Sequence, residues 1–207
     1  MHGCTTSGSL RYPRAVSSRL DALAVSAPDV VAAWRGIDAG RLIEVRREVR
    51  LRAGAGSSTF VAVQLGAVAA ALASLVEALP DAAFVMPGGE GDWNVAQALG
   101  HDAEARAGLA MAGARAASGR WPDDAPPVVP GIPGDADITR EALLRRLTVS
   151  QRIVERSART IAGHETDRCP LVHPLVGRMR CGEWLLFAGV HDLMHLQQLE
   201  TLEASLR

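Results

Sequence analysis

Four long segments rich in alanine and leucine, separated by stretches rich in glycine and proline, restrict what this chain can fold into. They run over residues 60–79, 93–117, 139–162 and 181–206. Alanine and leucine favour helices, and the chain has few of the alternations of apolar and polar residues that form strands. Only 4% of the residues are aromatic, so alanine, valine and leucine must form most of the core. We therefore predict an all-α protein built around a four-helix bundle.

The stretches between these segments suggest two parts. The GAGSS sequence at 54–58 is a linker-like break, which separates an N-terminal extension (1–56) from a four-helix domain (57–207). The extension is expected to be disordered in part, with a flexible lead over 1–14 and short helices at 15–25, 28–36 and 38–53. Within the second part, we expect the proline-rich residues 118–137 and the residues 163–179 to form long loops.

The charged residues exclude several common classes of protein. The net charge of −1 offers no general attraction to nucleic acid, so we predict no nucleic-acid partner. All 22 basic residues are arginines, because the chain contains no lysine. Nucleotide-binding P-loops and pyridoxal phosphate enzymes both depend on a lysine, so both are excluded in their usual form. The glycine-rich stretch at 86–93 follows no convincing strand and does not support a dinucleotide site.

Charge is unevenly distributed along the chain. Residues 1–56 carry nine arginines against five acidic residues, whereas the remainder carries 13 arginines against 18 acidic residues. We interpret the basic segment as a solvated face or a poorly ordered extension, and contact with an anionic partner is the alternative.

The expected location is the cytoplasm. No apolar signal-peptide core precedes Arg14, and Cys4, Cys169 and Cys181 are too few for a secreted disulfide framework. The apolar stretch at 60–79 is long enough to span a bilayer, but we interpret it as a buried bundle helix. We therefore expect no membrane partner.

Three histidines are placed as if to share one metal ion. His191 and His195 lie one turn apart on the apolar stripe of the last helix, where an unpaired imidazole would cost about 1–3 kcal/mol. His101 faces inward on another helix, beside Ala105 and Gly108, whose small size permits close packing. Imidazoles one turn apart reach one cation, so His101, His191 and His195 are predicted to bind a divalent metal. The alternative is that they are hydrogen-bonded core histidines.

Acidic residues and two further histidines adjoin this cluster. Asp102 and Glu104 are candidates for a catalytic base or for orienting the histidines. Asp192 is a third candidate for these roles. For all three carboxylates, however, we favour a position on a solvated face. We interpret His164 and His173 as loop residues, with the mouth of the site nearby.

Three motifs accompany the histidines. Trp93 precedes His101 by eight residues, HPLVG stands at 173–177, and EW at 183–184 leads into HDLMHLQQ at 191–198. In this combination the chain resembles the DinB/YfiT-like superfamily of metal-dependent enzymes over about residues 57–206. Residues 1–56 depart from the family pattern.

The resemblance implies a fold, a cofactor and a class of reaction. The implied fold is an up-up-down-down four-helix bundle that assembles as a homodimer. The implied cofactor is a nickel, zinc or iron ion held by His101, His191 and His195. Related enzymes transfer low-molecular-weight thiols such as bacillithiol, or isomerise maleylpyruvate with mycothiol.

The preferred hypothesis is a metal-dependent transferase or hydrolase. Its ion would activate a water or a low-molecular-weight thiol cosubstrate against a small-molecule substrate. In the thiol version, arginines that line the cavity hold the carboxylate of the cosubstrate, although the sequence does not say which arginines. The first alternative is a non-enzymatic metal-binding or stress-responsive bundle. The second is a helical module whose histidines are packed without a metal.

Overall fold

The structure is a computed structural model, and it describes residues 18–38, 40–88, 91–129 and 131–206. In these residues the chain is mostly helical, which confirms the predicted fold class apart from one small hairpin. The helices are α1 (Ser18–Ser26), α2 (Pro28–Asp38), α3 (Leu42–Arg52), α4 (Ser58–Ala78), α5 (Val95–Ala117), α6 (Arg140–Ile161) and α7 (Cys181–Ser205), with a short 3-10 helix η1 (Asp81–Val85) and the strands β1 (Arg168–His173) and β2 (Gly177–Arg180).

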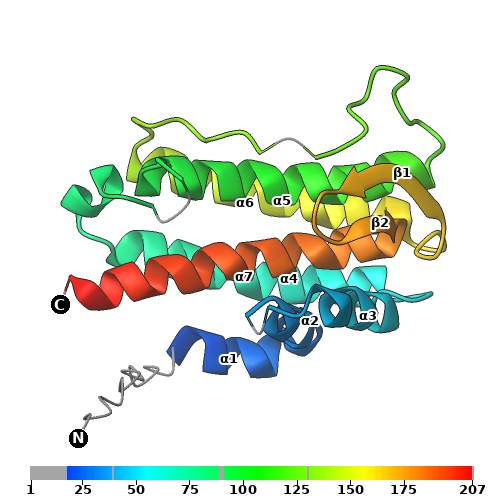
Figure 1. Cartoon of the computed structure of the whole chain (residues 1–207), viewed down its shortest axis with the longest axis horizontal. Coiled ribbons are helices and arrows are strands. Elements are labelled where there is room, and N and C mark those ends of the chain that lie inside the picture. Colours follow the sequence, from blue (N-terminus) through cyan, green and yellow to red (C-terminus); the bar gives the residue numbers. More distant parts are fainter. Residues whose placement is uncertain (1–17, 39, 89–90, 130, 207) are drawn as a thin grey trace, which may run out of the picture.

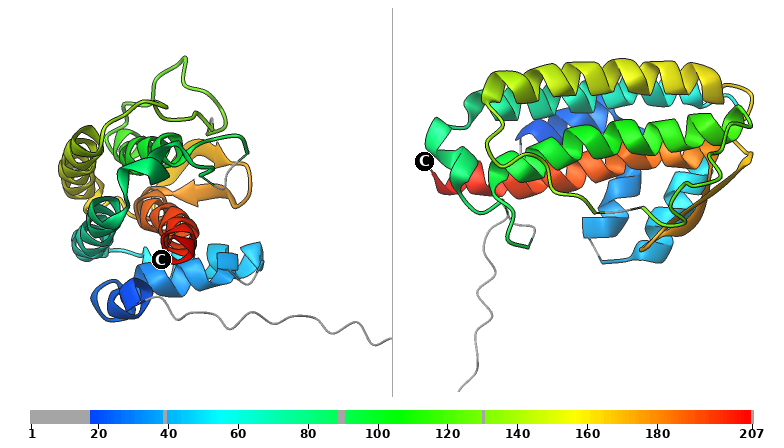
Figure 2. Two further views of the ribbon diagram at one scale, coloured as in Figure 1. Left: turned by 90° about the vertical axis from the view of Figure 1, so that its left-hand side faces the viewer. Right: turned by 90° about the horizontal axis from the view of Figure 1, so that it is seen from above.

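The four long helices, α4 to α7, pack side by side (Figures 1 and 2). Each of α4 and α5 contacts both α6 and α7, so that α4 and α5 lie diagonally opposite each other. Arg140 at the start of α6 donates to the Glu77 carbonyl near the end of α4, so these two helices are antiparallel. Gly113 near the end of α5 lies against Ile161 at the end of α6 and Cys181 at the start of α7. Helices α4 and α7 therefore run one way, and α5 and α6 run the other.

This order is up-down-down-up, so the up-up-down-down topology implied by the resemblance is wrong. The short connection over residues 79–94 turns the chain straight back, which makes α5 antiparallel to α4. The long connection over residues 118–139 returns along the bundle (Figure 1), and this lets α6 run parallel to its neighbour α5.

Residues 163–179, predicted as a loop, contain most of an antiparallel hairpin. His173 on β1 pairs with Gly177 on β2 across a tight turn. Along β1, Cys169 and Leu171 are buried while Arg168 and Pro170 are exposed, which is the period-two pattern of a half-buried strand. The strands are too short for this pattern to stand out in the sequence.

Helices α1 to α3 cover the side of the bundle formed by α4 and α7 (Figure 2). The α2 helix approaches closely at Gly189 of α7, where an added Cβ would lie 2.8 Å from a Val30 methyl group. Residues 181–190 of α7 are all buried, which explains why this first part of the helix is apolar on nearly every side. The helix predicted to begin at Asp38 begins at Leu42 instead, because α2 continues through Asp38. The predicted flexible lead, 1–14, lies outside the described residues.

Arginines of the basic N-terminal segment pair with acidic residues of α7. Arg19 Nη1 lies 2.7 Å from Glu203 Oε2 and 3.4 Å from Glu200 Oε1. Arg50 Nε donates to the buried Glu183 Oε1 at 3.0 Å. The uneven charge of the chain is therefore balanced in part within the molecule itself.

The apolar helix α4 is the one described helix with the length and composition of a membrane span. Half of its most apolar stretch is buried inside the protein. The helix packs against α6 and α7. Its buried Gln64 accepts the Asp29 backbone N–H at 2.9 Å and donates to Asp29 Oδ2 at 2.7 Å. These contacts are those of a core helix, as we predicted for this segment.

Local sequence determines where two of the long helices begin. Asn94 caps α5, because its side chain accepts the Gln97 N–H at 2.8 Å. The Gln97 side chain in return accepts the Asn94 N–H at 3.1 Å, which completes a capping box. Thr139 caps α6, and its hydroxyl accepts the Ala142 N–H at 3.3 Å.

The close approach of α5 and α7 can be tested by substitutions at two glycines of α5. Gly113→Ala should destabilise the protein by about 1–3 kcal/mol, because the new methyl carbon would lie 2.5 Å from the Cys181 carbonyl oxygen. Gly108→Ala is the matched control, since nothing lies within 4 Å of an added Cβ there. The control should gain about 0.5–1 kcal/mol of stability from its higher helix propensity. Urea denaturation measures both changes, and equal stabilities would contradict the close approach.

Candidate metal centre

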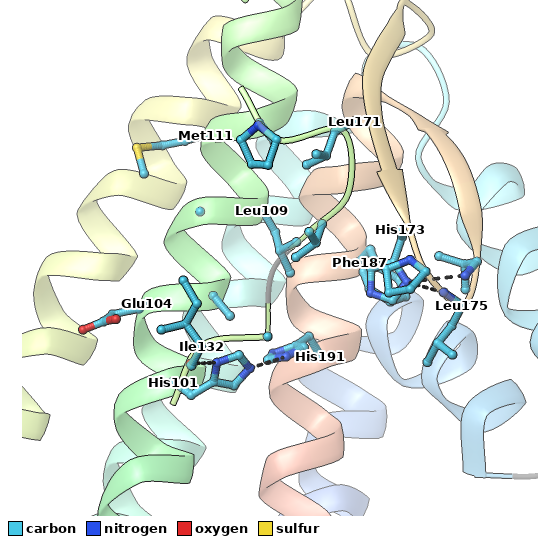
Figure 3. A pocket seen from close by; sticks show the side chains of 18 of the residues that line it. His101, Glu104, Leu109, Met111, Ile132, Leu171, His173, Leu175, Phe187 and His191 are labelled. Carbon is cyan, nitrogen blue, oxygen red and sulfur yellow. Dashed lines mark hydrogen bonds between the residues drawn. The ribbon is translucent and has the colours of Figure 1, made fainter. Parts of the chain in front are cut away.

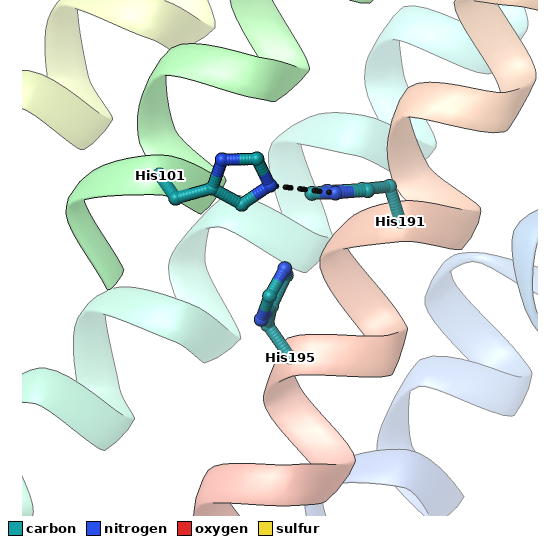
Figure 4. Close-up of side chains that lie close together, drawn as sticks. All are labelled: His101, His191 and His195. Carbon is teal, nitrogen blue, oxygen red and sulfur yellow. Dashed lines mark hydrogen bonds between the residues drawn. The ribbon is translucent and has the colours of Figure 1, made fainter. Parts of the chain in front are cut away.

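Three histidines from two helices meet inside the bundle (Figure 4). His101 projects from α5, while His191 and His195 project from consecutive turns of α7. One ring nitrogen from each histidine lies within 4.8 Å of the corresponding nitrogens of the other two. His101 Nε2 and His191 Nε2 are 3.3 Å apart. The structure thus brings together the three residues that the sequence singled out, in a cluster that can hold a metal ion.

The outer ring nitrogens of two histidines are held by acceptors. His101 Nδ1 lies 2.7 Å from the Ile132 carbonyl oxygen, which can only accept, so Nδ1 carries the proton. His191 Nδ1 lies 3.4 Å from Asp102 Oδ1, which favours the same tautomer. The two Nε2 atoms face each other across 3.3 Å, which is hydrogen-bond distance if one of them carries a proton. In the tautomer with both protons on Nδ1, both Nε2 lone pairs are directed at the space between the rings, where a metal ion could bind them.

His195 completes the cluster from below in Figure 4, with a ring nitrogen directed toward the gap between the other two rings. Its side chain is buried. Burial lowers the pKa of His195 to about 4, although the nearby Asp102 carboxylate acts in the opposite direction. His195 is therefore neutral near pH 7, which is the form of histidine that binds metals.

Asp102 is fully buried, so the predicted position on a solvated face is wrong for this residue. Burial alone would raise the pKa of Asp102, but its contact with His191 and the charges of His195 and Arg106 lower it. The ionised carboxylate lies against the outer nitrogen of His191 and not against solvent. Asp102 is thus placed to orient a histidine.

Glu104 does not lie at the histidines. Its carboxylate is 57% exposed and accepts from Arg146 Nη1 at 2.7 Å. Figure 3 shows the Glu104 side chain pointing away from His101. His164 is likewise remote, on the surface, where its ring contacts Asp167 at 2.8 Å.

A buried arginine connects this centre to the rest of the bundle, and sequence reasoning missed it. Arg106 on α5 is fully buried, and its Nε donates to Asp192 Oδ2 on α7 at 2.9 Å. Its Nη2 donates to the Leu65 carbonyl on α4 at 3.0 Å, and its Nη1 donates to Ser150 Oγ on α6 at 3.2 Å. One side chain therefore reaches all three of the other long helices. The sequence contained one indication of this role, because Arg106 follows Asp102 by four residues and so lies on the same face of the helix.

Asp192 is also fully buried, which contradicts its predicted place on a solvated face. Burial raises the pKa of Asp192, with the Arg106 guanidinium acting against this shift and the Asp102 carboxylate adding to it. The buried arginine is what permits two carboxylates to lie next to the same histidine.

A cavity of about 510 Å³ opens beside the histidines (Figure 3). His101 and His191 lie at one end, and most of the remaining wall is apolar, including Leu109, Leu171 and Phe187. This volume is typical of sites for small molecules. The histidine cluster is therefore accessible to a ligand of that size.

The proline-rich connection between α5 and α6 covers this cavity. The Val129 N–H donates to the Val172 carbonyl at 3.3 Å, and the Gly134 N–H donates to the Gln97 carbonyl at 3.1 Å. Between these two anchors lies Ile132, whose carbonyl accepts from His101. The long connection thus forms part of the site.

His173 lies at the end of β1 and lines the cavity, in agreement with its predicted place near the mouth. Its Nδ1 accepts the Leu175 N–H at 3.2 Å and the Val176 N–H at 3.4 Å, so the proton resides on Nε2. Burial lowers the pKa of His173 to about 4, and the charge of His191 contributes. His173 is therefore a neutral hydrogen-bond donor in the cavity wall.

Comparison with known families decides the evolutionary assignment. The profile of the DinB superfamily matches residues 64–199, a range that contains all three histidines. The chain belongs to the DinB superfamily. Members of this superfamily typically bind a metal, and the histidine cluster of this DinB protein is suited to one. Searches of curated proteins and of solved structures return no match to the chain.

The donor set of this DinB protein fits a divalent transition metal. Neutral imidazoles suit nickel, zinc and iron, whereas magnesium and calcium prefer oxygen ligands. The Ile132 carbonyl and the Asp102 carboxylate hold the outer nitrogens of two histidines, as is usual for histidine ligands of metals. Three protein ligands would leave further coordination positions open.

The contribution of Arg106 to the stability of the protein can be measured. Arg106→Met should lower the free energy of unfolding by about 3–5 kcal/mol, because Asp192 would lose its buried partner, and the Leu65 carbonyl and the Ser150 hydroxyl would lose their donor. Arg146→Met, which breaks the exposed pair with Glu104, should cost less than about 1 kcal/mol. Urea unfolding of both variants gives the comparison. A loss below about 1 kcal/mol for both would show that Arg106 does not hold the bundle together.

Proposed function

We propose that this protein is a metal-dependent enzyme in which His101, His191 and His195 hold one divalent ion of nickel, zinc or iron. The observation that supports the proposal most is the pair of Nε2 atoms 3.3 Å apart, whose rings are held by acceptors on their outer sides. Packed core histidines need no such convergence, whereas here one ring nitrogen of each of the three histidines lies within 4.8 Å of the other two.

A bound ion would supply Lewis acidity, which lowers the pKa of a water or of a low-molecular-weight thiol toward neutrality. The residues of the chain then have separate tasks. Asp102 and the Ile132 carbonyl keep His191 and His101 in the tautomers that bind a cation. His173 offers its Nε2–H to an oxygen of the small-molecule substrate, and the apolar walls exclude bulk water. This arrangement suits transfer to, or hydrolysis of, an electrophilic small molecule.

The alternative is a metal-binding or stress-responsive bundle without catalytic activity. The cavity of about 510 Å³ beside the histidines favours the enzyme, because storage or sensing of an ion requires no chamber for a second molecule. A screen of thiols and esters against electrophiles separates the two, since a binder would show no turnover with any of them. Cytoplasmic location and a homodimer remain part of the proposal, to be checked by cell fractionation and sedimentation velocity.

Metal analysis tests the centre directly. The purified protein, reconstituted with nickel, zinc or iron(II), should bind one ion per chain, and His101→Ala, His191→Ala and His195→Ala should each abolish stoichiometric binding. His164→Ala, which alters a surface histidine, is the control and should bind as the wild type does. Elemental analysis after gel filtration provides the measurement. Equal metal content in wild type and His191→Ala would remove both metal-based proposals.

Asp102 and Glu104 should differ sharply in their effect on the ion. Asp102→Asn should weaken metal affinity about 10- to 100-fold, because it removes the charged acceptor behind His191. Glu104→Gln should leave the affinity unchanged, since that carboxylate is bound to Arg146 at the surface. Competition with a chromophoric chelator gives both affinities. Similar losses in the two variants would mean that Asp102 has no orienting role.

A further inference from the structure

The chemistry of the cavity changes along its length. At one end lie His101 and His191. At the other end lies Arg115, which follows His101 on α5 by almost four turns, or about 20 Å at a rise of 1.5 Å per residue. A ligand that contacts both ends must therefore be elongated.

The wall between these ends is apolar. Leu109 and Ala112 contribute from α5, and Leu171 contributes from β1 (Figure 3 labels Leu109 and Leu171). Trp121 and Val129 close the cavity from the long connection. Apart from His173, these residues offer few partners for a ligand that carries many hydroxyl groups, whose burial without hydrogen bonds is unfavourable. The wall suits a hydrocarbon chain instead.

Arg115 is the one arginine among the described residues that line the cavity. It is exposed, and no acidic side chain of the described residues forms an ion pair with it. Glu104, the acidic residue of the lining, is already bound to Arg146. The guanidinium of Arg115 is therefore available to an anion, and its planar fork matches a carboxylate.

We propose that the cavity binds an elongated single-chain carboxylate, of the class of medium- and long-chain fatty acids. Its carboxylate pairs with Arg115, its chain lies against Leu109 and Leu171, and its far end reaches His101 and His191. Placing the far end at a metal rests on the proposed function, whereas binding of the acid itself does not. The substrate class of the enzyme would then be fatty acids that carry a reactive group at the end remote from the carboxylate.

Gly108 offers a way to close the cavity without disturbing the fold. It lies in the cavity wall on α5, between the histidine end and the arginine end. Nothing lies within 4 Å of an added Cβ at this position. A leucine here would project into the space that the hydrocarbon chain occupies, and it would also favour the helix.

Isothermal titration of the full-length protein with decanoate, dodecanoate and tetradecanoate tests the proposal. One of these acids should bind with a stoichiometry of one per chain, and Arg115→Gln should weaken its binding about tenfold to hundredfold. Arg152→Gln, which alters an exposed arginine outside the cavity, should bind the acid as the wild type does. Dodecanol, which lacks the charge, should bind wild type and Arg115→Gln equally well.

Variants of Gly108 provide a second test of the proposal. Gly108→Leu should weaken binding of the acid at least tenfold while Gly108→Ala retains it, and urea unfolding should show that both remain folded. The proposal is overturned if none of the acids binds, or if Arg115→Gln and Gly108→Leu bind like the wild type. Metal content, measured on the same samples, separates the two proposals. Arginine-dependent binding without metal would refute only the metal centre, and stoichiometric metal without acid binding would refute only this inference.

Discussion

The buried guanidinium of Arg106 is the interaction on which the rest of the structure depends. It donates to groups on α4, α6 and α7, and it carries the charge that compensates Asp192. Asp192 and Asp102 both lie close to His191, and burial works against the charge of each. The contact with His191 lowers the pKa of Asp102 most, and the Arg106 guanidinium acts in the same direction. Arg106 thus contributes both to the packing of the bundle and to the charge that orients a candidate ligand.

The sequence predicted the long helices well, because their apolar residues recur at helical spacing over more than five turns. It did not predict how they run relative to one another, since an amphipathic stripe has the same period in either direction. The β1–β2 hairpin was missed for a different reason, since two strands this short show too few alternations to be distinguished from a loop. The first residue of α5 could not be read from the sequence either, because Asp92 and Asn94 are both good caps and the structure uses Asn94.

The histidines of the candidate site could be predicted because they are polar residues at helix positions that the periodicity reserves for apolar ones. His191 and His195 occupy apolar positions of their helix, and the structure brings His101 to them from α5. The burial of Asp102 and Asp192 was not foreseen, because their compensating arginine was not recognised as a core residue. The Ile132 carbonyl could not be found from sequence at all, since a backbone group in an irregular segment carries no residue-type signal.

The long connection between α5 and α6 has one further consequence. This connection covers the cavity, and it also supplies the Ile132 carbonyl that holds the His101 ring. A ligand large enough to displace this segment would release the His101 ring and so weaken the binding of a cation. Thermodynamic reciprocity then requires that the cation weaken the binding of the ligand to the same degree. Binding in the cavity and binding of a cation at the histidine cluster would then be thermodynamically coupled.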